Sequence, residues 1–113
     1  MEKNDVYKRI EGFLADSEVV LFMKGSPDFP QCGFSANGVG ILNYFNSQYK
    51  SYNVLEDNEL REGIKKFSNW PTVPQIYMKK EFIGGADILK EIAENGEIED
   101  ILKEKKIEYS ISA

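Results

Sequence analysis

The feature that most constrains the fold is an uninterrupted apolar run over residues 19–23. A strand with one face in water alternates polar and apolar residues, whereas a run that is apolar throughout suits a strand covered on both faces. The run ends at Lys24-Gly25, and the nearby Pro27 and Pro30 exclude regular structure in the segment that follows. The sequence therefore predicts a central strand with helices on both sides of its sheet.

Helical and strand patterns alternate along the rest of the chain. Apolar residues recur at helical spacing over 6–14, 34–45 and 60–67. The same spacing predicts a further helix that begins at Asp87 and a last helix over 98–102. Short strand patterns occupy 51–55, 75–78 and 81–83. Because the first two strands bracket a helix, we expect them to be parallel, with a right-handed crossover. We predict a single α/β domain over residues 1–113, with a four-stranded mixed sheet flanked by about five helices. Its core should span about 4–107, followed by a loose tail over about 108–113.

Composition excludes several classes of function. The 113 residues include no histidine, which excludes Ser-His-Asp and Cys-His nucleophile pairs and every zinc site that uses histidine. The net charge of −5 argues against a nucleic-acid partner, because neutralising phosphates requires clustered Lys and Arg. No apolar run approaches the roughly 20 residues that a membrane span requires. We therefore expect neither nucleic acid nor membrane as a partner.

A single cysteine, Cys32, excludes an intrachain disulfide and favours a reducing compartment inside the cell. The first residues, 1–5, lack the apolar region of a signal peptide. We therefore expect a cytoplasmic location. An organellar matrix is the alternative, if a transit segment has been trimmed.

Cys32 is the first candidate for chemistry. It lies between a proline-containing loop and a predicted helix, where unpaired backbone N–H groups and the helix dipole stabilise a thiolate. Lys24 ends the preceding strand and would add a positive charge. The alternative is a buried, inert cysteine, but the neighbouring Gln31, Gly33 and Ser35 form no apolar stripe. Ser35 stands where a C-x-x-C motif has its second thiol, so a disulfide at Cys32 must be resolved by an external thiol.

Two further segments and two further residues each have both a structural and a functional interpretation. Thr72-Val73-Pro74 marks a strand boundary, or else holds a cis proline that exposes the Val73 backbone to a ligand. The segment 84–87 is a strand end with a helix cap, or an anion site at a helix N-terminus. Arg61 is a solvated surface charge, or a clamp for a ligand carboxylate. Phe34 is a core anchor, or an aromatic wall beside the thiol.

Together these segments resemble the monothiol glutaredoxins of the CGFS class. The matching motifs are Lys24-Gly25-Ser26-Pro27, Pro30-Gln31-Cys32-Gly33-Phe34-Ser35, Asn69-Trp70-Pro71-Thr72-Val73-Pro74-Gln75 and Gly84-Gly85-Ala86-Asp87. They occur in the family's order, and the resemblance extends from about residue 4 to residue 107. It implies a thioredoxin fold, a cis Pro74 and a groove for glutathione.

The resemblance also assigns roles within that groove. Lys24 and Arg61 would meet the carboxylate at the glycine end of glutathione, and the Val73 backbone would pair with the cysteinyl unit. The Ala86 backbone and Asp87 would hold the γ-glutamyl end. The predicted site comprises Lys24, Cys32, Gly33, Phe34, Arg61, Thr72, Val73, Pro74, Gly85, Ala86 and Asp87.

Proteins of this family bridge a [2Fe–2S] cluster between two protomers, each supplying its active-site cysteine and one glutathione. This agrees with the residue count, because such a cluster takes four thiolate ligands and each chain has only Cys32. The resemblance thus implies a carrier that is a monomer when apo and a homodimer when loaded. It would transfer the cluster to apo iron–sulfur proteins, with a BolA-like protein as a further partner. The alternative is a glutathione-dependent thiol–disulfide oxidoreductase that uses Cys32 alone.

Overall fold

A computed structural model describes residues 3–111 of the chain. The helices are α1 (Lys3–Asp16), α2 (Gly33–Tyr44), α3 (Asn58–Ser68), α4 (Ala86–Glu94) and α5 (Glu97–Glu104), with a short 3-10 helix, η1 (Val54–Glu56). The strands are β1 (Val19–Met23), β2 (Lys50–Asn53), β3 (Gln75–Met78) and β4 (Glu81–Gly84). The predicted alternation of helices and strands is confirmed.

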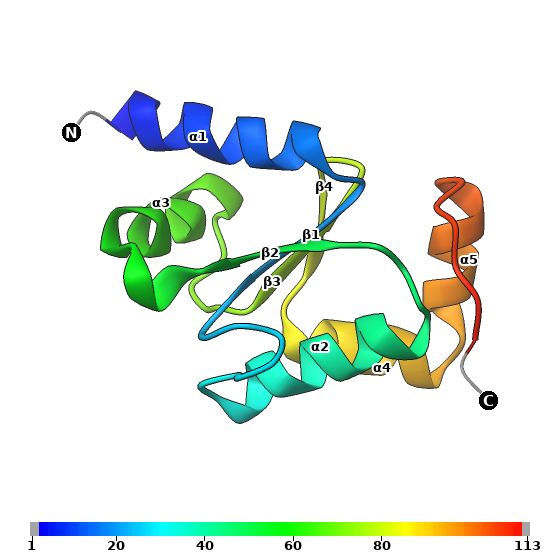
Figure 1. Ribbon diagram of the computed structural model, residues 1–113. Helices are drawn as coiled ribbons and strands as arrows, with labels where there is room; N and C mark the ends of the chain where they lie inside the picture. The colour runs from blue at the N-terminus through cyan, green and yellow to red at the C-terminus, as the bar shows by residue number, and fades with distance from the viewer. Residues whose placement is uncertain (1–2, 112–113) are drawn as a thin grey trace.

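The four strands form one mixed sheet in the order β2-β1-β3-β4. β1 runs parallel to β2 and antiparallel to β3, and β3 forms an antiparallel hairpin with β4. Every residue of β1 is buried. Both faces of the strand are therefore covered, as its apolar sequence predicts (Figure 1).

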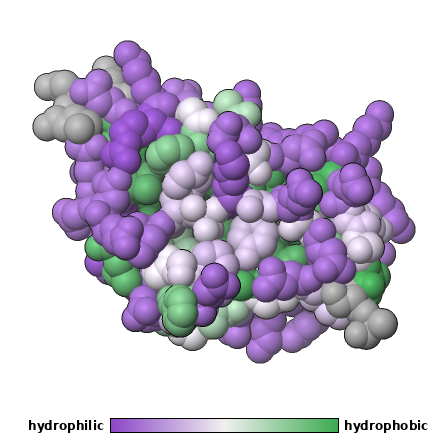
Figure 2. All heavy atoms as spheres, in the orientation of Figure 1, coloured by the Kyte–Doolittle hydropathy of each residue, from purple (hydrophilic) through white to green (hydrophobic). Residues whose placement is uncertain are grey.

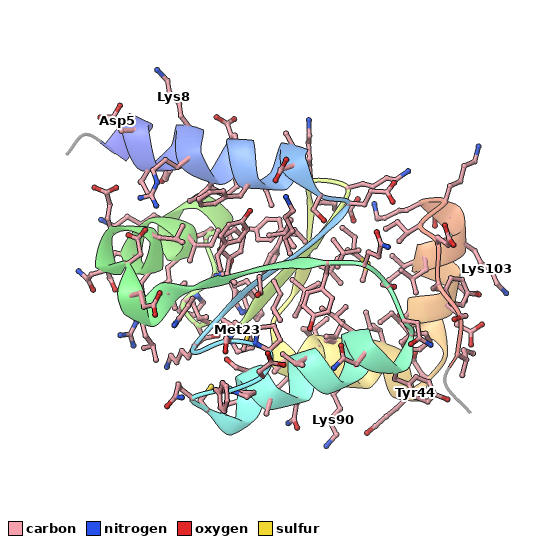
Figure 3. The ribbon with its side chains drawn as sticks, in the orientation of Figure 1. Asp5, Lys8, Met23, Tyr44, Lys90 and Lys103 are labelled. Atoms are coloured by element: carbon pink, nitrogen blue, oxygen red, sulfur yellow. The ribbon has the colours of Figure 1, made fainter. Side chains whose placement is uncertain are left out.

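Alternate residues of β1 enter two separate cores. Val19, Leu21 and Met23 pack with α2, α4 and α5, whereas Val20 and Phe22 pack with α1 and α3. Figure 3 shows side chains filling the space on both sides of the sheet, while the labelled Lys8, Lys90 and Lys103 point away from it. This sheet between two helical layers, with its β2-β1-β3-β4 order, is the thioredoxin fold.

Two segments depart from the sequence-based expectation. The strand predicted over 51–55 ends at Asn53, because the Asn53 side chain accepts a hydrogen bond from the Leu55 backbone N–H at 3.0 Å and the chain turns into η1. The tail predicted to be loose is held against α2: the Ser110 N–H donates to the Phe45 carbonyl at 3.0 Å, and the Tyr109 ring packs edge-on against Phe45. Positions 112–113 lie outside the described residues.

The surface in the view of Figure 2 consists mainly of hydrophilic side chains, interrupted by small hydrophobic patches. Between residues 3 and 111, no helix combines the length and apolar character that crossing a bilayer requires.

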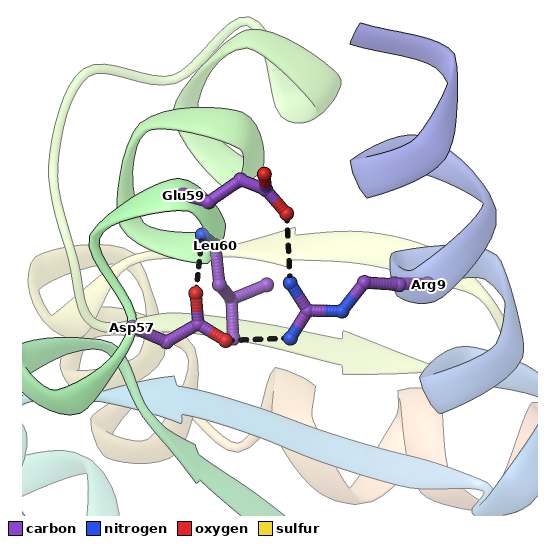
Figure 4. A network of polar contacts seen from close by, with 4 residues as sticks. All are labelled: Arg9, Asp57, Glu59 and Leu60. Atoms are coloured by element: carbon purple, nitrogen blue, oxygen red, sulfur yellow. Dashed lines mark hydrogen bonds and ion pairs between the residues drawn. The ribbon is translucent and has the colours of Figure 1, made fainter. Parts of the chain in front are cut away.

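An ion-pair network fastens α1 to the start of α3 (Figure 4). The Arg9 guanidinium donates to Asp57 at 2.5 Å and to Glu59 at 3.0 Å. The other Asp57 oxygen accepts from the Leu60 N–H at 3.0 Å, so this carboxylate also caps α3. The hydrogen bond from Arg9 outweighs desolvation and, with the Leu60 N–H, lowers the pKa of Asp57. The same residue thereby starts α3 and attaches it to α1.

We expect Asp57→Ala to lower the free energy of unfolding by about 1–2 kcal/mol, mainly through the lost cap. Asp57→Asn should lose less, since asparagine also caps and the partly exposed ion pair with Arg9 contributes at most about 1 kcal/mol. Because folding lowers the Asp57 pKa, its charge-dependent stabilisation is present above the unfolded pKa of about 4 and is lost as the pH falls through the folded value. Urea unfolding at pH 7 and pH 3 measures both effects, with Glu59→Gln as the control that keeps the cap. An Asp57→Ala protein as stable as the parent at pH 7 would contradict this role.

Candidate functional site

Hydrogen bonds hold together the two ends of the loop between β1 and α2. The Gln31 N–H donates to the Lys24 carbonyl at 2.9 Å, and the Gly25 N–H donates to the Asn53 side chain at 2.9 Å. Gly25 has a φ of +90°, and a Cβ at this position would lie 2.5 Å from the Phe29 carbonyl oxygen. Only glycine fits this turn, which delivers the chain to the start of α2 in a fixed position.

Cys32 is the N-cap residue of α2. Its sulfur accepts from the Ser35 backbone N–H at 3.3 Å and lies 3.2 Å from the Ser35 hydroxyl oxygen. The side chain is half-buried, so the thiol remains accessible from outside. The prediction of a cysteine at the junction of loop and helix is confirmed.

The surroundings of Cys32 favour its thiolate. Burial alone would raise the pKa of the thiol. Hydrogen bonds from the Ser35 side chain and from the backbones of Ser35 and Phe34 outweigh that effect, and the Lys24 ammonium adds attraction. The net result is a Cys32 pKa below its ordinary value, which increases the fraction of the reactive thiolate at neutral pH.

A groove of about 360 Å³ lies beside this thiol. It is lined by Lys24, Phe34, Arg61, Lys65, Trp70, Pro71, Thr72, Val73, Pro74, Gly85, Ala86, Asp87 and Ile88. Nine of the predicted site residues are in this set, although they come from five separate segments of the sequence. Cys32 and Gly33 do not line the groove, but both adjoin Phe34, which does.

One part of the groove is cationic. Lys24 extends from the end of β1, while Arg61 and Lys65 lie one turn apart on α3. The Nε atom of Arg61 is buried and has no hydrogen-bond partner among the described residues. A buried, unpaired donor beside further cations suits a ligand that carries a carboxylate.

Another part of the groove is formed by backbone. The Val73–Pro74 peptide bond is cis, which confirms the expectation drawn from the resemblance. Pairing of β1 with β3 ends at Gln75, so the backbone of Val73 lies outside the sheet. Gly85 is the N-cap residue of α4, where no side chain caps the free N–H groups. A Cβ on Gly85 would lie 3.1 Å from the Trp70 indole nitrogen, so a side chain here would require Trp70 to shift by a few tenths of an ångström.

Four lining residues were missing from the predicted site: Lys65, Trp70, Pro71 and Ile88. Lys65 follows Arg61 by four residues on a predicted helix, a spacing that places both on one face and would have identified it. Trp70 and Pro71 belong to a motif that had already been singled out. Ile88 enters the groove through the packing of α4, which no spacing rule predicts.

Residues 3–111 contain no group of three or more acidic or cysteine side chains placed to hold a metal ion. Among these residues Cys32 is the only thiol. A thiolate-ligated metal centre therefore needs ligands from another molecule.

A thiol at a helix N-terminus, a cis proline in the wall of the groove and a thioredoxin fold together place this chain in the thioredoxin superfamily. The glutaredoxin family profile matches residues 19–83. The chain is 52% identical over 103 residues to the protein named "Monothiol glutaredoxin-5, mitochondrial" of Saccharomyces cerevisiae, covering 88% of this chain and 69% of that protein. The chain belongs to the glutaredoxin family, among the monothiol glutaredoxins.

Solved structures agree with this placement. The solution structure of reduced poplar apo GrxS14 has a TM-score of 0.79 and 42% identity, covering 89% of this chain and 93% of that one. A crystal structure of a buckwheat glutaredoxin–glutathione complex has a TM-score of 0.80 over 93% of this chain and 94% of that one. At 16% identity, the buckwheat protein shares the fold with this chain.

Proposed function

We propose that this protein binds glutathione in the groove and carries a [2Fe–2S] cluster to apo iron–sulfur proteins. The observation that carries the proposal is a single accessible thiol, Cys32, beside a groove with carboxylate-binding side chains and no second thiol nearby. The bound tripeptide would supply the thiolate that the chain lacks. The buckwheat glutaredoxin was solved as a complex with glutathione, which supports this choice of ligand.

Different residues of the groove would bind different parts of glutathione, according to their chemistry. Lys24 and Arg61 offer charge-assisted donors to the carboxylate at the glycine end. The Val73 backbone, which lies outside the sheet, is available to pair with the cysteinyl unit. The N-terminus of α4, whose N–H groups no side chain caps, receives the γ-glutamyl end at Ala86 and Asp87. Phe34, Thr72, Pro74 and Gly85 form the walls, and Gly33 allows close approach beside the thiol.

The cluster is cargo, and the number of thiols sets the stoichiometry. A [2Fe–2S] cluster takes four thiolates, whereas one chain offers Cys32 alone. Two chains with two glutathiones complete the set. We therefore propose that the single domain is a monomer without cluster and a homodimer with it.

We also propose protein partners and a cellular compartment. Apo iron–sulfur proteins would receive the cluster, and a BolA-like protein would be a second partner. A lone, accessible thiol suits a reducing compartment, and we place the protein in the cytoplasm, with an organellar matrix as the alternative. The word "mitochondrial" in the yeast relative's name describes that protein.

Anaerobic reconstitution with iron and sulfide, with and without glutathione, tests the proposal. We expect visible absorbance, two irons per dimer and a doubled solution mass only when glutathione is present, because the chain alone lacks half of the ligands. Absorbance, iron content and sedimentation should be read on the same sample. A cluster formed equally well without any small thiol would contradict the shared site, as would a stable dimer of the cluster-free protein.

A second candidate is a glutathione-dependent oxidoreductase, which is favoured by the lowered pKa of Cys32. The Cys32 thiolate would attack the glutathionyl sulfur of a mixed disulfide, expelling the substrate thiolate. A second glutathione thiolate would then attack that sulfur, releasing glutathione disulfide and regenerating Cys32. A coupled assay with a glutathionylated substrate separates the two functions, since vigorous turnover without cluster formation would favour the oxidoreductase.

A further inference from the structure

Gln75 is the last residue of the proline-containing motif beside the groove, and its side chain is fully buried. It begins β3 and lies on the same face of that strand as Tyr77, two residues further on. Among the described residues, only Ser35 and Ser47 are also polar and buried. Removing a carboxamide from water costs free energy unless the group is hydrogen-bonded, so the partners of Gln75 indicate why it is here.

The partners are two backbone carbonyls of the segment 70–74. Two prolines in this segment have no N–H, so its backbone is short of donors for its own carbonyl groups. The amide nitrogen of Gln75 donates to the Thr72 carbonyl at 3.0 Å and to the Trp70 carbonyl at 3.3 Å. One side chain thereby supplies two donors to a segment that lacks them.

The orientation of the Gln75 amide is fixed from both ends. A carbonyl oxygen can only accept, so the amide nitrogen must face Trp70 and Thr72. At the other end, the amide oxygen accepts from the Tyr77 hydroxyl at 3.2 Å. Burial raises the pKa of Tyr77 to about 12, so this phenol remains a donor at neutral pH. Both amide hydrogens and the amide oxygen are therefore in use.

The segment that Gln75 holds is one wall of the groove, since every residue from 70 to 74 lines it. Gln75 itself lies behind that wall and is not among the lining residues. We infer that Gln75 is a positioning residue, whose buried carboxamide fixes the backbone of residues 70–74 and so sets the place of the groove wall. The inference rests on the proposed function only in taking glutathione as the ligand of the groove.

The test is Gln75→Met, which keeps the length of the side chain and removes both donors. Trp70 is the only tryptophan in the sequence, so fluorescence reports on this wall alone. Its indole nitrogen is buried, and its ring centroid lies 5.6 Å from that of Phe82. If the wall moves, the emission should shift to longer wavelength and quenching by acrylamide should increase. A displaced wall loses about one hydrogen bond to the ligand, so anaerobic titration with reduced glutathione should show about tenfold weaker binding.

Tyr77→Phe is the matched control, because it removes one hydrogen bond from the same buried amide and leaves both bonds to the wall in place. It should lower the urea midpoint, yet leave Trp70 emission and glutathione affinity close to those of the parent. A folded Gln75→Met protein with the emission and quenching of the parent would overturn the inference. Equal losses of glutathione affinity in the two variants would also overturn it, since they would indicate a general effect of stability.

A measurement on the unaltered protein covers the case in which Gln75→Met does not fold. The side-chain amide protons of Gln75 should exchange with solvent far more slowly than those of Gln48, which is exposed. Saturating glutathione should slow the Gln75 exchange further, because the ligand holds the same wall from its other side. Exchange as fast as that of Gln48, or exchange that saturating glutathione leaves unchanged, would overturn the inference.

Failure of the inference can be told apart from failure of the proposed function. All samples are free of iron and sulfide, so none of the readouts depends on a cluster. A parent protein that binds no glutathione would contradict the proposed ligand. In that event the emission and quenching of Trp70 in Gln75→Met would still decide whether Gln75 positions the wall.

Discussion

Replacing Cys32 with serine should abolish the cluster binding that we propose, while leaving the fold intact. The chain has no other thiol, so the variant offers no thiolate to iron. The sulfur of Cys32 also caps α2 by accepting from the Ser35 N–H, and serine is among the best N-cap residues. The substitution therefore removes the ligand and keeps the structural contact.

The measurement is anaerobic reconstitution of the variant in the presence of glutathione, followed by iron analysis and visible absorbance. Thermal unfolding monitored by circular dichroism supplies the control and should give a midpoint close to that of the parent. Iron and colour retained in the folded serine variant would contradict the assignment of Cys32 as the ligand.

Gly25→Ala should be among the most damaging single-methyl additions in this protein. The φ of +90° at Gly25 is a conformation that costs an alanine about 1–3 kcal/mol. The added Cβ would also lie 2.5 Å from the Phe29 carbonyl oxygen and 2.7 Å from the Gln31 nitrogen, both of them backbone atoms that cannot rotate away. We expect the free energy of unfolding to fall by at least about 2 kcal/mol. We also expect Cys32 reactivity to change, because the loop would have to open.

Gly12→Ala is the matched control for chemical denaturation. Gly12 lies within α1, and a Cβ there meets no atom within 4 Å. Alanine should therefore stabilise the helix by up to about 1 kcal/mol. If the two substitutions changed stability by the same amount, the loop geometry at Gly25 would not be the cause.

Much of this fold could be predicted from local patterns. The apolar run of β1 predicted burial on both faces, and the motifs around Cys32 and Pro74 predicted the two sides of the site. In contrast, the end of β2 depended on one side chain. Val54 and Leu55 have strand character, but the Asn53 amide binds the Leu55 N–H and turns the chain.

The remaining differences arose from tertiary contacts. The segment from Glu108 was predicted to be a loose tail. In the structure the Tyr109 ring packs against the Phe45 ring, and the Ser110 N–H donates to the Phe45 carbonyl. The hydrogen bond from the Lys24 N–H to the Ser35 hydroxyl could not be predicted from the sequence either, because the two groups meet only after β1 and α2 have packed. Such pairings depend on the folded arrangement and have no signal in sequence spacing.

The Asn53 amide has a consequence for how the groove takes up a ligand. One oxygen accepts from both the Gly25 N–H at 2.9 Å and the Leu55 N–H at 3.0 Å, so it ties the thiol's loop to the turn that leads into α3. The loop that leads to Cys32 and the helix that carries Arg61 are thereby joined before any ligand arrives. Chain entropy in this region is therefore lost during folding rather than on association, which lowers the entropic cost of binding a ligand in the groove.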